Sequence, residues 1–109
     1  MTLDLKKTNA PSKLIPAATI LLLREKDARL EVLMLRRNKD LKAFGGAWVF
    51  PGGRVDAEDG PGQSVLERAR IAAIRETAEE TGLDISNSAM VTLSNWIPPV
   101  AEIRRFSTW

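Results

Sequence analysis

The stretch RETAEETGL, residues 75–83, decides how this sequence is interpreted. It places three carboxylates, Glu76, Glu79 and Glu80, close together on a predicted helix that Gly82 terminates. Like charges four residues apart destabilise a helix, and negative charge in the last turn faces the wrong end of the helix dipole. A bound divalent cation would turn this repulsion into attraction. A local rule broken in this way marks a candidate functional site.

A solvent-exposed helix face is the alternative interpretation of the same cluster. Glutamates on a helix surface are usually solvated, and Arg75 can pair with Glu79 at the i,i+4 spacing. The three glutamates alone therefore leave both interpretations open.

The helical pattern is expected to run from Gln63 or Ser64 to Thr81, with Ser64 as N-cap and Glu67 at the capping-box spacing. On a helical wheel the apolar stripe consists of Ile71, Ile74 and Ala78. The glutamates fall on the opposite side, beside the small residues Ala69 and Ala72, which leave room for something to approach the helix.

The composition limits the chemistry that the chain can perform. Its 109 residues suffice for one domain, and 44% apolar residues predict a folded one. A charge of +2 without a dense basic cluster predicts no nucleic-acid partner. The absence of Cys and His excludes thiolate chemistry and the commonest transition-metal ligand. Acid–base and metal chemistry must then fall mainly on carboxylates, with Lys, Arg and Ser as lesser candidates, and an all-oxygen site suits Mg²⁺, Mn²⁺ or Ca²⁺.

The remaining segments predict an α/β domain over residues 15–109, preceded by a loose arm over residues 1–14. The apolar run IPAATILLL at residues 15–23 is too short to cross a bilayer, so we expect no membrane partner and a cytoplasmic location. Residues 51–62 are expected to be irregular. Strands are expected at residues 16–24, 30–37, 48–50, 89–97 and 104–109, and the first two should form a hairpin.

Together with FPGG at residues 50–53, the glutamate helix resembles the Nudix box. In that family a Gly and a Glu precede Arg-Glu-apolar-x-Glu-Glu-x-Gly-apolar. The second half is filled here by Arg75, Glu76, Glu79, Glu80, Gly82 and Leu83, with Glu67 eight positions before the arginine. Chance agreement at the six later positions is on the order of one in a million per start.

Two features depart from the family pattern. Thr77 occupies a position that is usually apolar. Thirteen residues separate Gly53 from Glu67, where the standard box has five. Since long surface insertions cost little loop-closure entropy, we expect the site to survive this one.

The resemblance implies a Nudix-type α/β/α sandwich with a mixed sheet, and roles for particular residues. Glu76 would serve as or orient the base, and Arg75 and Glu67 would be a structural pair that fixes the helix to the loop. Gly52 belongs to a loop whose backbone approaches the metal closely. The implied ligands of Mg²⁺ or Mn²⁺ are Glu76, Glu79, Glu80 and the carbonyl oxygen of Gly53.

The resemblance also implies metal-assisted hydrolysis of a small-molecule diphosphate. Residues 33–53 resemble the signature of the coenzyme A diphosphatase branch, and the later WIPP and RRFSTW segments resemble peroxisomal acyl-coenzyme A hydrolases. Coenzyme A or an acyl-coenzyme A is therefore the favoured substrate. Alternatives are a nucleotide sugar, a dinucleotide, or a non-catalytic nucleotide-binding module. Substrate-binding candidates are Arg37, Lys42, Gly52 and Trp48, although Arg37 and Lys42 could be solvated and Trp48 could be core.

The family domain is normally longer than this chain, which ends at Trp109 inside a predicted strand. We therefore expect an incomplete sandwich at the C-terminal end. An unfinished strand is a template for pairing with another copy, so a homodimer through this strand is also expected.

Overall fold

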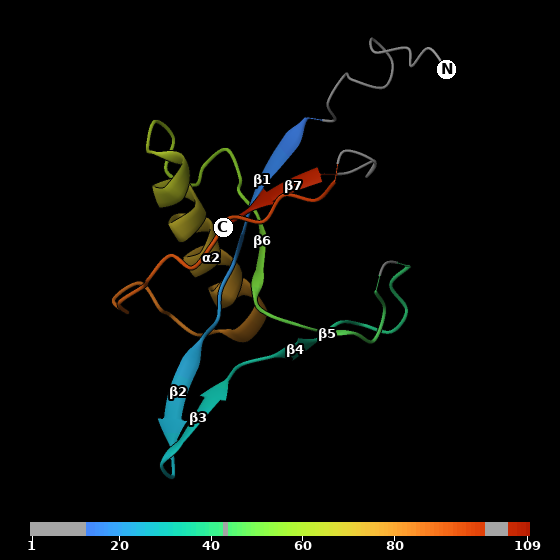
Figure 1. The fold of residues 1–109 in the computed structure, drawn as a ribbon, viewed down its shortest axis with the longest axis vertical. Helices are drawn as coiled ribbons and strands as arrows, with labels where there is room; N and C mark the ends of the chain where they lie inside the picture. Colours follow the sequence, from blue (N-terminus) through green and yellow to red (C-terminus); the bar gives the residue numbers. More distant parts are fainter. Residues whose placement is uncertain (1–12, 43, 100–104) are drawn as a thin grey trace.

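The computed structural model describes residues 13–42, 44–99 and 105–109, which form seven strands and one helix (Figure 1). In chain order these are β1 (Leu14–Thr19), β2 (Leu23–Lys26), β3 (Arg29–Val32), β4 (Leu35–Arg36), β5 (Trp48–Val49), β6 (Gly52–Arg54), α2 (Val65–Thr81) and β7 (Arg105–Thr108). No helix within these ranges has the length and hydrophobicity needed to span a bilayer.

A three-stranded mixed sheet forms the centre of the fold, in the order β6-β1-β7. Strand β1 pairs antiparallel with β6, where Ala18 lies opposite Gly53, and parallel with β7, where Ile15 lies opposite Phe106. The predicted α/β class with a mixed sheet is confirmed. The second helical layer of the predicted sandwich is not present in the described ranges.

Helix α2 covers one face of this sheet and contacts β1 and β6 (Figure 1). Its buried side chains are all small and follow helical spacing: Ala69, Ala72, Ala73 and Thr77. The three alanines pack with buried Ala18 of β1. Small side chains on both surfaces let the helix and the sheet backbone approach closely. This approach brings the C-terminal part of α2 against β6.

The apolar stripe predicted for the helix was wrong. Ile71 and Ile74 are only half-buried and Ala78 is exposed, whereas the alanines beside the glutamates form the buried face. The reason is that the sheet packs directly against the small side chains of α2, where we expected open space. The space next to the glutamates is therefore occupied by the glycine-containing strand β6.

Both ends of α2 agree with the prediction. The Ser64 hydroxyl accepts a hydrogen bond from the Glu67 amide at 3.1 Å, as an N-cap does. Gly82 adopts the left-handed conformation with φ 78° and donates its amide to the Ala78 carbonyl at 2.9 Å. These local signals confirm the helix boundaries.

The strand predictions were only partly right. The run 16–24 divides into β1 and β2, and the run 30–37 divides into β3 and β4, although the β2–β3 hairpin is confirmed. Strand β6 lies inside a segment that was expected to be irregular. The predicted strand 89–97 is absent, apart from a single bridge between Trp96 and Thr108.

Burial explains the missing strand at 89–97. Val91 is 87% exposed and Leu93 is 74% exposed, so this apolar segment gains little burial within the described ranges. The predicted C-terminal strand is confirmed over Arg105–Thr108, and Arg104 lies outside the described residues. Of the predicted N-terminal arm, residues 1–12 also lie outside them, while Leu14 already belongs to β1.

Candidate active site

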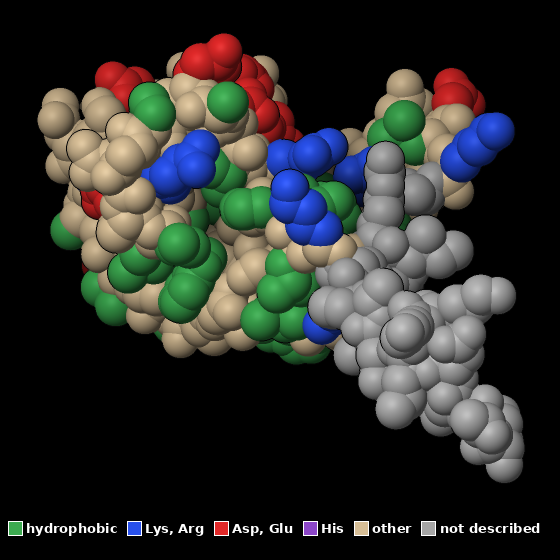
Figure 2. Space-filling view, turned by 90° about the horizontal axis from the view of Figure 1, so that it is seen from above, with side chains coloured by type: hydrophobic (Ala, Val, Ile, Leu, Met, Phe, Trp, Pro, Cys, Tyr) green, Lys and Arg blue, Asp and Glu red, His purple; other side chains and the backbone are tan. Residues whose placement is uncertain are grey.

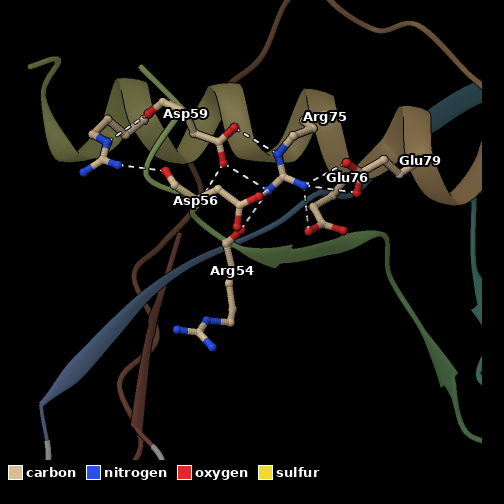
Figure 3. A network of polar contacts seen from close by, with 7 residues as sticks. Arg54, Asp56, Asp59, Arg75, Glu76 and Glu79 are labelled. Atoms are coloured by element: carbon tan, nitrogen blue, oxygen red, sulfur yellow. Dashed lines mark hydrogen bonds and ion pairs between the residues drawn. The ribbon is translucent and has the colours of Figure 1, made fainter. Parts of the chain in front are cut away.

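Arg75 is the centre of a polar network that joins α2 to the loop before it (Figure 3). Its Nε and Nη2 donate to the two carboxylate oxygens of Asp59 at 2.9 and 3.0 Å. Nη2 also donates to the Arg54 carbonyl at 3.0 Å. Nη1 donates to Glu76 and to Glu79, each at 3.1 Å. One guanidinium thus holds the inserted loop, β6 and two of the candidate metal ligands.

Electrostatics keep the Arg75–Asp59 pair ionised. The hydrogen bonds from Arg75 lower the pKa of Asp59 despite the opposing effect of burial. The same bonds raise the pKa of Arg75, with smaller contributions from Glu79 and Glu76. A bidentate arginine–carboxylate pair combines charge with fixed geometry, so it defines the orientation of both side chains.

A second arginine holds the inserted loop from the same helix. Arg68 donates from Nε to the Asp59 carbonyl at 2.8 Å and from Nη2 to the Asp56 carbonyl at 2.9 Å. Within the loop, the Asp59 carboxylate accepts from the Asp56 amide at 2.7 Å. The insertion is therefore an ordered turn whose backbone carbonyls and side chain bind to α2.

The predicted pair between Arg75 and Glu67 was wrong. Glu67 lies 3.4 Å from Arg70, three residues along the helix, and Asp59 occupies the fork of Arg75 instead. The inserted loop supplies this competing carboxylate from directly beside the helix. Sequence analysis missed Asp59 and Asp56; the only available signal was their position in the acidic insertion VDAEDGPG.

Glu76 and Glu80 both meet the glycine pair of β6. An added Cβ at Gly53 would lie 2.5 Å from the carboxyl carbon of Glu76, so the absent side chain makes the space in which this carboxylate sits. The Gly52 amide donates to Oε1 of Glu80 at 3.0 Å. A Cβ at Gly52 would overlap the Ala18 carbonyl oxygen. Gly53 therefore makes room for the Glu76 carboxylate, and Gly52 lets β6 lie close to β1.

Burial raises the pKa of Glu76, and the neighbouring Glu79 and Glu80 raise it further, while hydrogen bonding to Arg75 lowers it. The net balance raises the pKa of Glu76, because Arg75 offsets only part of the effect of burial and of the two neighbouring carboxylates. A cation added to this cluster would reverse that balance.

The donor set suits a hard divalent cation, but the side chains do not gather on one point. Among the described residues, no group of three or more acidic side chains is arranged to hold a metal. Glu79 turns toward Arg75 and Glu80 toward Gly52. The all-oxygen donor set, with the Glu76 carboxylate packed against the Gly53 backbone, nevertheless suits Mg²⁺ or Mn²⁺.

A cavity of about 300 Å³ lies beside the glycine pair. Its lining includes Arg37 and Arg54 together with Glu80 and Gly53, so basic groups and two candidate metal ligands share one space. In Figure 3 the Arg54 side chain points away from the network that its carbonyl joins. Sequence analysis missed Arg54, whose signal is its position directly after FPGG.

Figure 2 shows Lys and Arg side chains beside exposed hydrophobic ones, with acidic side chains gathered along one edge.

The other predicted substrate contacts lie elsewhere. Trp48 pairs with Arg36 across β4 and β5, so it faces the opposite side from the neighbouring residue Arg37. It is 63% exposed, and the Arg36 guanidinium lies 5.9 Å from the centre of its ring. Lys42 is exposed. The structure thus brings Arg37 and Gly52 together at the cavity but not Trp48.

The fold and the carboxylate helix define the class of protein. The structure is similar to that of a NUDIX hydrolase from Alicyclobacillus acidocaldarius, with a TM-score of 0.70 and 22% identity over 91% of this chain and 68% of that one. It is also similar to the Ap4A hydrolase of C. elegans, with a TM-score of 0.59 and 24% identity over 88% and 64% of the two chains. The fold is therefore that of the Nudix hydrolases.

The family follows from the sequence comparison. The NUDIX domain model matches residues 13–108, and the chain belongs to the Nudix family. It is 38% identical over 73 residues to the m7GpppN-mRNA hydrolase NUDT17 of Xenopus laevis, covering 64% of this chain and 22% of that protein. It is 34% identical over 91 residues to the peroxisomal coenzyme A diphosphatase ndx-8 of Caenorhabditis elegans, covering 82% and 36%. The chain thus spans about a fifth to a third of these relatives.

Proposed function

We propose that this chain carries a metal-dependent site for hydrolysis of the diphosphate bond in a nucleoside diphosphate-linked substrate. One observation carries the proposal: Glu76 and Glu80 meet the Gly52–Gly53 backbone at the edge of a cavity that Arg37 and Arg54 line. Membership of the Nudix family supports the reaction class.

Glu76, Glu79, Glu80 and the Gly53 carbonyl would hold Mg²⁺ or Mn²⁺. When bound, such a cation supplies positive charge that neutralises diphosphate oxygens and activates water. Hard cations prefer oxygen ligands, and the chain offers only oxygen donors here. In the structure Glu79 accepts from Arg75 and Glu80 accepts from the Gly52 amide, so both side chains would turn to bind the cation.

The chain's own residues have separate tasks in this reaction. Arg75 holds Glu76 against Gly53, and Glu76 accepts the proton of the attacking water. The water oxygen bonds to one phosphorus while the bond from that phosphorus to the bridging oxygen breaks, so the leaving phosphate keeps the electron pair. Arg37 and Arg54 would bind the phosphate oxygens, for which planar guanidinium groups are suited.

Coenzyme A or an acyl-coenzyme A is the proposed substrate. Support comes from the signature over residues 33–53 and from the relative named as a coenzyme A diphosphatase. The names of other relatives point to capped RNA and to a dinucleoside tetraphosphate, and these compete with the proposal.

A substrate screen with Mg²⁺ and with Mn²⁺ tests both the reaction and the substrate. It compares coenzyme A, acyl-coenzyme A, an ADP-sugar, NADH, a dinucleoside tetraphosphate and capped RNA. We expect the highest kcat/KM with coenzyme A or its acyl form. Faster turnover of another compound would contradict the substrate, and binding without turnover of any compound would identify a non-catalytic module.

A homodimer through the C-terminal strand and a cytoplasmic location stay predictions. Strand β7 pairs with β1 along one edge, and Trp96 bridges Thr108 on the other. Sedimentation that shows a monomer at high concentration would refute the dimer, and fractionation of cells would test the location.

A further inference from the structure

Asp59 lies in the insertion that separates this chain from the standard Nudix box, and it is almost fully buried, at 3% exposure. Both of its carboxylate oxygens have partners: Oδ1 accepts from Arg75, and Oδ2 accepts from Arg75 and from the Asp56 amide. A buried carboxylate is tolerated when it is paired and hydrogen-bonded in this manner. The insertion thus brings two carboxylates to Arg75 of α2, the buried Asp59 and the half-exposed Asp56, which lies 3.3 Å from Nη2.

The hydrogen bonds of the Arg75 guanidinium show how the Asp59 carboxylate affects its orientation. A guanidinium has five N–H donors in a fixed plane. Asp59 binds both Nε and Nη2, and Nη2 also meets the Arg54 carbonyl and, at 3.3 Å, the Asp56 carboxylate. This leaves Nη1 for Glu76 and Glu79. Asp59 therefore determines which edge of the guanidinium faces the two glutamates.

We propose that Asp59 is a positioning residue of the cation site, which orients Arg75 and balances its charge so that Glu76 and Glu79 remain available to a divalent cation. The inference rests on the function proposed above. Without Asp59, only the half-exposed Asp56 carboxylate, 3.3 Å from Nη2, would remain opposite this edge of Arg75. Arg75 would then attract both glutamates more strongly and repel the cation. The inserted loop then contributes to the site directly, because Asp59 forms the pair with Arg75 that was expected of Glu67.

The test measures Mn²⁺ affinity of the whole chain by electron paramagnetic resonance of free Mn²⁺. It compares the wild type with Asp59→Asn and Glu67→Gln, which each remove one negative charge without removing a proposed ligand. Groups that hold metal ligands in place typically contribute about 10- to 100-fold to affinity. We expect Asp59→Asn to raise the Kd at least about tenfold and Glu67→Gln to change it less than about twofold.

Two results would overturn the inference alone: equal Mn²⁺ affinity in the wild type and Asp59→Asn, or a larger loss in Glu67→Gln. Absence of Mn²⁺ binding by the wild type would overturn the proposed function and this inference together. If circular dichroism shows that Asp59→Asn does not fold, the nuclear magnetic resonance signal of the Arg75 Nε proton decides. An unchanged signal in Glu67→Gln supports the Asp59 pair, and a lost or shifted signal contradicts it.

Discussion

Gly53 is the residue at which backbone geometry and carboxylate chemistry meet. Its lack of a side chain leaves the space that the Glu76 carboxylate occupies, and its carbonyl is a proposed metal ligand. The family motif made the glutamates and the glycine pair predictable from sequence. The pair between Asp59 and Arg75 was not, because it joins residues 16 positions apart through an insertion without periodicity.

Gly53→Ala should reduce hydrolysis at least about tenfold while the free energy of unfolding changes by less than about 1 kcal/mol. The added methyl group displaces the flexible end of Glu76 rather than backbone. The control is Gly62→Ala, where the new Cβ meets nothing but φ is 83°. This control should lose stability and keep its activity per folded molecule. Unchanged kcat in Gly53→Ala would contradict the placement of Glu76.

Arg54→Ala should raise KM for the diphosphate substrate about tenfold, since a hydrogen bond to a charged group contributes about 1.5–3 kcal/mol. The Arg54 carbonyl remains available to Arg75, so kcat should change less. Steady-state kinetics measure both constants. Arg29→Ala, on the exposed hairpin strand β3, is the control with the same change of charge. Equal KM values for the two variants would remove Arg54 from the substrate site.

At the level of elements, the helix was predictable and several strands were not. The ends of α2 depend on local signals, a Ser64 cap and a Gly82 stop, and these act without help from the rest of the fold. Strand β6 contains two glycines, which have low strand propensity, and it forms because β1 pairs with it. The segment 89–97 has the composition of a strand but no partner in the described ranges to bury it.

Ser64→Ala should lower the free energy of unfolding by about 1 kcal/mol, because it removes the acceptor for the Glu67 amide. Urea denaturation measures the change. The control Ser88→Ala removes a hydroxyl from an exposed residue after the helix and should be near neutral. Since the cap lies far along α2 from the glutamates, Mn²⁺ affinity should be unchanged. Loss of affinity in Ser64→Ala would show that the cap and the site are coupled.

For the molecule as a whole, the Asp59–Arg75 pair links stability to pH. The folded state lowers the pKa of Asp59, so this stabilisation is present above the unfolded value of about 3.9 and is lost as pH falls through the lower folded value. Glu76 acts with the opposite sign, because its raised pKa makes its stabilisation greatest below its unfolded value of about 4.3.

Asp59→Asn should therefore lower stability at pH 7 and flatten the loss of stability between about pH 4 and pH 2. Urea unfolding of the wild type and the variant at pH 7 and at pH 3 measures this difference. Glu67→Gln is the control, because its side chain bonds only weakly to Arg70, at 3.4 Å. Equal pH dependence of Asp59→Asn and the wild type would contradict the strength of the pair.

The most direct test of the proposed cation site is the melting temperature of the wild type and of Glu80→Gln, measured with and without Mn²⁺. Glutamine keeps an acceptor for the Gly52 amide but removes the charge. A ligand at 100 times its Kd stabilises the folded state by about 2.7 kcal/mol, which should raise the wild-type Tm by roughly 10 °C. The Glu80→Gln rise should be much smaller, with apo stability equal or slightly higher. Glu25→Gln on the exposed strand β2 should respond like the wild type. Equal Mn²⁺-induced shifts in the wild type and Glu80→Gln would contradict the assignment of Glu80 as a metal ligand.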